Sequence, residues 1–134
     1  MNHKMNSMSE EHIKNALSYE KEDKLHFAIR ELQMAIDLEP DNAIAYCHLG
    51  RVCEKKGKLE ISIQMYKNAI DLKPEYIEAY VHLCIVYLKL KQYADALKNF
   101  KMAEKFDIAG SYSHYYDLAN KEQYEEIIKS YILE

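Results

Sequence analysis

The sequence predicts an all-α fold, a solenoid built from repeated pairs of antiparallel helices. Two prolines, Pro40 and Pro74, lie 34 residues apart, and each ends the same phrase, AIDLEP at 35–40 and AIDLKP at 69–74. Repetition at a fixed period of this length is typical of stacked helical repeats. The chain contains only three glycines and two prolines, and β-branched runs are almost absent, which favours helix throughout.

Small and aromatic residues recur at the same spacing in three successive segments. The segment 43–76 carries the pattern best, with Tyr46, Leu49, Gly50, Ser62, Tyr66, Ala69 and Pro74. This pattern resembles the signature of the tetratricopeptide-repeat (TPR) family, an aromatic, Leu-Gly, Tyr, Ala, Phe, Ala and Pro. The segment 77–110 follows it but has Ile108 in place of the proline, and the segment 9–42 has His12 and Asn15 in place of the aromatic and the leucine.

The repeats set the expected organisation of the chain as one domain. We expect a flexible N-terminus at 1–8, repeats at 9–42, 43–76 and 77–110, and a degenerate fourth helix pair or a single capping helix at 111–134. Helices are predicted near 9–22, 25–38, 43–56, 59–72, 77–90 and 93–106. Asn42 is expected to cap the third helix, and Gly57 to end it in a left-handed conformation. The small residues Gly50, Ala69 and Ala103 should let helices approach closely.

Composition argues against several classes of function. The net charge is −4, with lysine and glutamate interspersed, so no basic surface for nucleic acid is indicated. Three cysteines without a CxxC motif argue against a disulfide framework and against structural zinc. The longest apolar stretch, 81–90, is too short to span a bilayer. We therefore expect a cytoplasmic protein with no membrane insertion.

The family resemblance implies a right-handed superhelix whose concave groove is lined by the first helix of each pair. Transferring the groove positions onto this chain gives a candidate surface for a protein or peptide, apolar at its centre, with Arg51 placed to meet an acidic group. The candidate residues are Ile13, Lys14 and Leu17, then Ile44, Cys47, His48, Arg51 and Lys55, and finally Glu78, Val81, His82, Ile85 and Lys89. The alternative is that Ile13, Leu17, Val81 and Ile85 belong to the core or pack under the C-terminal helix.

One activity of the family is not expected here. Some members bind the acidic tails of heat-shock chaperones through a clamp of lysines, asparagines and an arginine or lysine. The matching positions in this chain hold Ile13, Leu17, His48, Glu78 and His82, so no residue of that clamp is preserved. The two histidines could instead make binding depend on pH, because histidine titrates near pH 6.5. They have no third ligand at a suitable spacing, so we expect no metal site.

No motif for catalysis or for a cofactor is present. The sequence contains no glycine-rich phosphate loop, no HExxH and no GxSxG. We therefore expect an interaction module or adaptor and no enzyme. The alternative is a structural or assembly module that self-associates into a homo-oligomer through the apolar C-terminal segment, or through the first helix.

Overall fold

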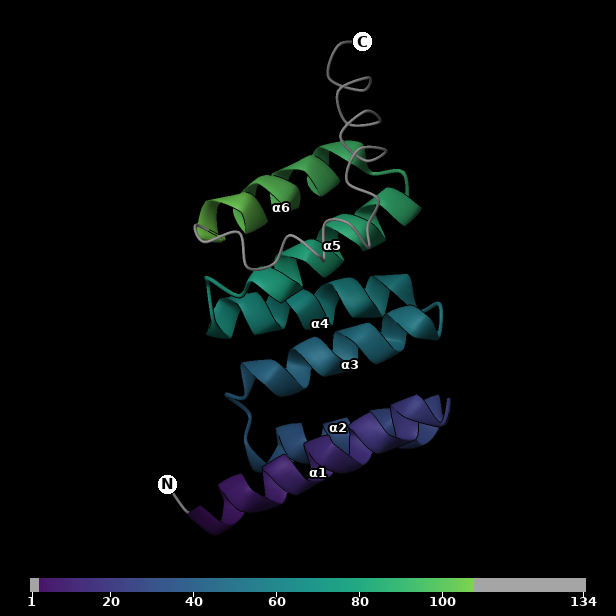
Figure 1. The fold of residues 1–134 in the computed structure, drawn as a ribbon, viewed down its shortest axis with the longest axis vertical. Coiled ribbons are helices and arrows are strands. Elements are labelled where there is room, and N and C mark those ends of the chain that lie inside the picture. The colour runs from purple at the N-terminus through teal and green to yellow at the C-terminus, as the bar shows by residue number, and fades with distance from the viewer. Residues whose placement is uncertain (1–2, 108–134) are drawn as a thin grey trace. The chain divides into compact units, whose positions relative to one another are not determined.

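The computed structural model describes residues 3–107, which form six helices connected by short turns, with no strand among them. The chain divides into two compact units, Met1–Pro74 and Glu75–Glu134, and each is described by itself. Figure 1 shows the helices as successive antiparallel pairs within these units. The predicted all-α class is therefore confirmed. The expectations for 111–134 lie outside the described residues.

The first unit contains two helix pairs that share one core. Helix α1 (His3–Lys21) packs against α2 (Leu25–Leu38), α3 (Ala43–Lys55) packs against α4 (Leu59–Leu72), and α2 packs against α3. One buried cluster joins α1, α2 and α3, because each helix buries its apolar stripe against its neighbours. Its members are Ala16, Ala28, Leu32, Leu49, Val52 and Cys53.

The turns follow the sequence signals. Pro40 and Pro74 lie just beyond the last residues of α2 and α4. The Asn42 side chain caps α3, since its Oδ1 accepts a hydrogen bond from the backbone N–H of Ala45 at 3.2 Å. Gly57 takes a left-handed conformation at φ 82°. Both the cap and the glycine turn were predicted.

Two further residues adopt the same left-handed turn although neither is a glycine. Asp23 has φ 59° and Lys91 has φ 60°, and they lie one repeat before and one repeat after Gly57. A left-handed conformation costs an ordinary residue roughly 1–2 kcal/mol. The packing of each helix pair therefore imposes the left-handed turn. Of the three repeats, only the middle one has glycine at this position, the residue that adopts the conformation at least cost.

The first helix corrects one expectation. We expected 1–8 to be flexible and the helix to begin at residue 9, but α1 begins at His3. Ser9 lies inside the helix and is fully buried, and its hydroxyl donates a hydrogen bond to the carbonyl of Ala35 on α2 at 3.3 Å. This hydrogen bond links α1 to α2 at a position well inside α1. The other helices begin where predicted and end at most one residue early.

The contact between α3 and α4 depends on Gly50. The ring of Tyr66 on α4 is fully buried, and its hydroxyl donates a hydrogen bond to Glu54 Oε1 at 2.8 Å. A Cβ atom at position 50 would lie 2.8 Å from the Cδ1 and Cε1 atoms of this ring. Since a buried ring held at its hydroxyl cannot easily move aside, the close approach of α3 and α4 requires glycine there.

The second unit contains one described pair, α5 (Ile77–Lys89) and α6 (Tyr93–Phe106), which pack against each other. Leu83 and Val86 on α5 are buried, as are Ala96 and Ala103 on α6. Tyr80 and Phe106 stack with their ring centroids 5.9 Å apart, which links the start of one helix to the end of the other.

We predict that Gly50→Ala destabilises the protein. The added methyl group overlaps the Tyr66 ring, which should lower the free energy of unfolding by about 1–3 kcal/mol despite the better helix propensity of alanine. Urea unfolding followed by circular dichroism measures this change. In a Tyr66→Leu background the same substitution should cost much less. An equal cost in both backgrounds would show that the ring is not the obstacle.

Candidate partner-binding face

Seven side chains from α1 and α3 form the candidate site, which we call the α1–α3 face. On α1 they follow the spacing i, i+4, i+7, and on α3 they follow i, i+4, i+7, i+11, so each set lies along one side of its helix. Contacts of Glu20 with α3 show that the two rows are neighbours. The members are Ile13, Leu17 and Glu20 on α1, and Ile44, His48, Arg51 and Lys55 on α3.

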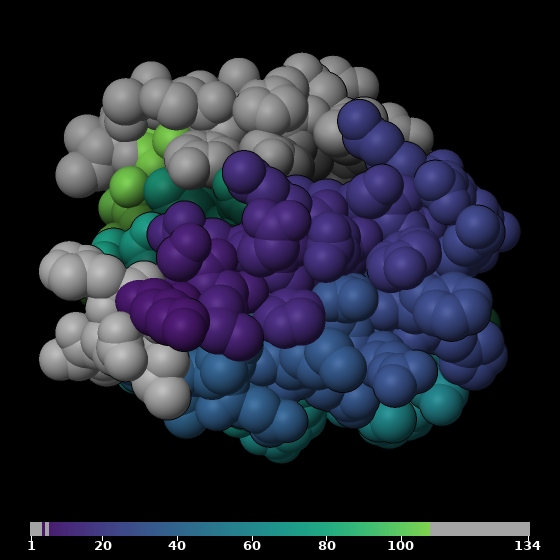
Figure 2. Space-filling model, turned by 90° about the horizontal axis from the view of Figure 1, so that it is seen from below, coloured from purple at the N-terminus to yellow at the C-terminus, as the bar shows by residue number. Residues whose placement is uncertain are grey.

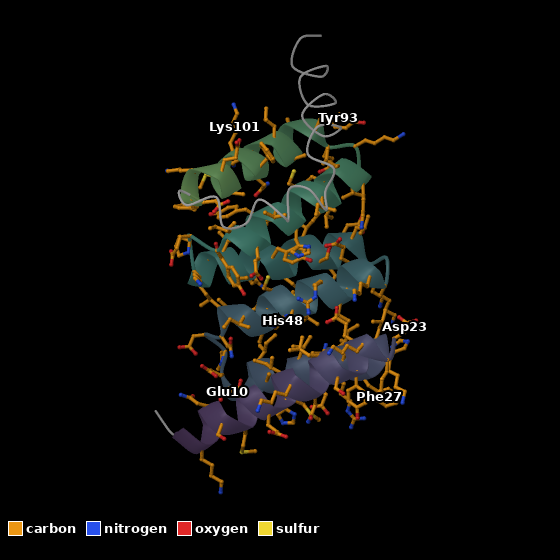
Figure 3. The ribbon with its side chains drawn as sticks, viewed as in Figure 1. Glu10, Asp23, Phe27, His48, Tyr93 and Lys101 are labelled. Atoms are coloured by element: carbon orange, nitrogen blue, oxygen red, sulfur yellow. The ribbon has the colours of Figure 1, made fainter. Side chains whose placement is uncertain are left out.

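The apolar part of the face is only partly covered. Ile44 is 51% exposed and lies in the same row as half-buried His48. Leu17 and His48 are half-buried, and Ile13 is half-buried against the core cluster. Figure 3 labels His48 on α3, within the first unit. The α1–α3 face is therefore apolar toward the N-terminal ends of its two helices and charged toward their C-terminal ends.

The charged end is an ion-pair cluster centred on Glu20. Arg51 donates two hydrogen bonds to this carboxylate, from Nε to Oε2 at 3.1 Å and from an Nη atom to Oε1 at 2.6 Å. The ammonium group of Lys55 lies 2.8 Å from Oε2. The Glu20 side chain is 8% exposed, whereas those of Arg51 and Lys55 are 27% and 52% exposed. The bidentate bond between Glu20 and Arg51 is thus well shielded from water.

The cluster keeps Glu20 ionised. Burial alone would raise the pKa of Glu20, but the hydrogen bonds and positive charges of Arg51 and Lys55 outweigh it and lower the pKa to about 2. This pairing adds stability above the ordinary pKa of a glutamate, and the contribution is lost as the pH falls toward 2. At neutral pH the cluster therefore contains two cations and one carboxylate.

His48 is a neutral group in this setting. Burial and then the positive charge of Arg51 lower the pKa of His48 to about 4. Its Nδ1 atom is buried and has no hydrogen-bond partner among the described residues. The structure therefore predicts that His48 titrates well below the ordinary value near pH 6.5. The sequence pattern could not show it, because the shift depends on how deeply the neighbouring helices cover the ring.

Two candidate residues are buried. Cys47 is 3% exposed and Val81 is 4% exposed, so we remove both from the accessible surface. The thiol of Cys47 lies close enough to Arg51 and Tyr66 to influence their pKa values, which places it beneath the face. Of the other candidates, Lys14 on α1 and Lys89 on α5 are exposed, and Glu78, His82 and Ile85 on α5 are half-buried.

The sequence analysis missed Glu20. It placed Arg51 opposite an acidic group of a partner, but in the structure this acidic group belongs to the chain itself. The available signal was spacing, because Glu20 lies seven residues after Ile13 and three after Leu17, on the same side of α1. What the spacing could not give is the register of α1 against α3.

Other kinds of site find little support in the described part of the chain. Residues 3–107 contain no group of three histidine, cysteine, aspartate or glutamate side chains that could hold a metal ion. None of the helices described has the length and apolar character needed to cross a membrane. All three cysteines are buried thiols, and burial raises the pKa of Cys84 to about 12.

Stacked antiparallel helix pairs with a partly exposed apolar face define a helical-repeat protein. Residues 50–91 match the family model described as TPR repeat. The chain thus contains a tetratricopeptide repeat, and the resemblance found in the sequence is confirmed. No curated protein matches the chain.

Solved structures show the same fold. One of them is the TPR2B domain of yeast Sti1, solved in a complex with pHsp70. Its sequence is 20% identical, the alignment covers 92% of this chain and 98% of that domain, and the TM-score is 0.83. The first TPR domain of Spaghetti (RPAP3), bound to the HSP90 peptide SRMEEVD, is 14% identical with 95% of each chain covered and a TM-score of 0.82. MamA is 29% identical over 76% of this chain, with a TM-score of 0.73, and this chain spans 60% of it.

We predict that His48 titrates far below an ordinary histidine. Its NMR signals should report a midpoint near pH 4, whereas a midpoint near 6.5 would contradict its burial beside Arg51. Because the unfolded state takes up this proton first, stability should fall as the pH drops from 6.5 to 4. His48→Gln should remove that part of the fall, as measured by urea unfolding at each pH.

Proposed function

We propose that this protein is an interaction module that binds a peptide or partner protein through the α1–α3 face. The observation that carries the proposal is the 51% exposure of Ile44 beside half-buried Leu17 and His48. A contiguous apolar patch that is left uncovered commonly marks a docking site, and we propose that Ile44 and Leu17 belong to such a patch. The peptide complexes of Sti1 and RPAP3 support an interaction role for the fold, although at their low identity they do not indicate the partner.

Apolar contacts would supply most of the binding energy. A partner's aliphatic or aromatic side chain seated on Ile44 and Leu17 would remove them from water, at roughly 25 cal/mol per Å² of apolar area. The half-buried Glu78, His82 and Ile85, with exposed Lys89, are proposed as contacts of the second unit. We propose no catalytic role and a reducing, cytoplasmic location, which suits three buried thiols.

Self-association is the second candidate function. The C-terminal segment 111–134, to which we assigned it, lies outside the described residues. The first helix pair, however, leaves Met8, Phe27 and Met34 at 44%, 52% and 36% exposure. Figure 2 shows α1 in purple and α2 in blue side by side at the surface of the first unit. A mass that rises with concentration in sedimentation, and that Phe27→Glu abolishes, would favour this function.

We predict that Ile44→Lys weakens peptide binding. The wild-type protein is first used to select binders from a displayed library of random nonapeptides, and the affinity of an enriched peptide is then measured by fluorescence anisotropy. Placing a lysine at this exposed position should weaken binding at least about tenfold, since a buried apolar contact is worth 1–3 kcal/mol. Stability should change little, because half of the Ile44 side chain is already exposed.

Ile61→Lys is the matched control. Ile61 is 47% exposed, lies in the same unit and receives the same charge, but it belongs to α4. It should bind the peptide as the wild-type protein does. Equal affinities for both variants would exclude the α1–α3 face as the binding site, and a library from which the wild type enriches nothing would contradict the proposed function altogether.

A further inference from the structure

The cations of the α1–α3 face are already occupied by a carboxylate of the chain. Both oxygens of Glu20 are engaged, one by an Nη atom of Arg51 and the other by Nε of Arg51 and by Lys55. One edge of the guanidinium is used in this bidentate pair, the geometry in which arginine otherwise holds the carboxylate of a ligand. Glu20 thus takes the place that an acidic partner would need.

Displacing Glu20 would be unfavourable for an incoming carboxylate. The exchange replaces one bidentate ion pair by another, so it gains little in charge interaction. It also leaves the carboxylate of Glu20, whose side chain is 8% exposed, without its partners, and an unpaired charge at low exposure is costly. Lys55 alone is 52% exposed, and a cation that is so well solvated adds little to affinity.

The rest of the face is uncharged. Ile44 and Leu17 are aliphatic, and His48 is shielded from protonation by its burial beside Arg51. A neutral imidazole carries one N–H donor and one acceptor, so its Nε2–H tautomer suits an uncharged acceptor such as a peptide carbonyl. An apolar side chain with its neutral backbone therefore matches this surface better than an acidic segment does.

We propose that Glu20 is a specificity-determining residue of the α1–α3 face, which occupies Arg51 and Lys55 so that the face prefers uncharged aliphatic segments to acidic ones. This inference rests on the proposed function, because it names the class of segment that the same face binds. It also makes a distinct prediction, since freeing the two cations should change the preference of the face without abolishing binding.

The test compares the wild type with Glu20→Gln, which keeps the size of the side chain but removes its charge. Two probes are used, an aliphatic uncharged nonapeptide enriched by the wild type and the acidic peptide SRMEEVD. We expect Glu20→Gln to raise affinity for the acidic peptide relative to the uncharged one by about tenfold, near the lower limit for one hydrogen bond to a charged group. Glu11→Gln removes an exposed charge from the same helix and should leave this ratio unchanged.

The outcomes separate the two proposals. If Glu20→Gln is folded by circular dichroism and its ratio equals that of the wild type, Glu20 does not set specificity. The same holds if the wild type enriches mainly acidic peptides. If the wild type enriches none, the proposed function fails instead.

A measurement on the wild type covers the case in which Glu20→Gln does not fold. With the cations occupied internally, the wild type should bind SRMEEVD no more tightly than the uncharged peptide at low salt as well as at high salt, because no free cation is there to pair with an acidic side chain. A tenfold preference for SRMEEVD at low salt that is lost at high salt would mean that Arg51 or Lys55 pairs with the partner, and would overturn the inference.

Discussion

The ring of Tyr66 lies against the backbone of Gly50, and this contact fixes how closely α3 can approach α4. Because the Tyr66 ring is fully buried and its hydroxyl is bound to Glu54, the side of α3 that carries Gly50 is held in the core. The rotation of α3 about its axis is thereby fixed, and so are the directions of its other side chains. Ile44 and His48 lie on other sides of α3 than Gly50, in the row that continues to Arg51 and its contact with Glu20 of α1.

The pairing of Glu20 with Arg51 adds a second constraint, between α1 and α3. Ion pairs at low exposure contribute little net stability compared with apolar packing, since removing two charges from water offsets their attraction. The effect of this pair is better seen in what the face can bind. It holds a carboxylate next to an apolar patch, so that the charge of Arg51 is neutralised within the chain before any partner arrives.

Much of the fold could be predicted, because a 34-residue period specifies where each helix begins and ends. The start of α1 could not, since the burial of Ser9 against Ala35 is a tertiary contact. The site was predicted less well. Spacing places Ile44 and His48 on one side of a helix, but it does not show that Cys47 lies beneath that side. Nor does it reveal which residue of α1 meets Arg51, which depends on the register between helices.

The central claim is that partners bind the side shared by α1 and α3, and mapping amide chemical shifts tests it most directly. A peptide selected by the wild type would be titrated into isotope-labelled protein. The account predicts that shifts concentrate at Leu17 and Glu20 on α1 and at Ile44, His48 and Arg51 on α3. Shifts confined to α2 and α4, with these five residues unchanged, would contradict it.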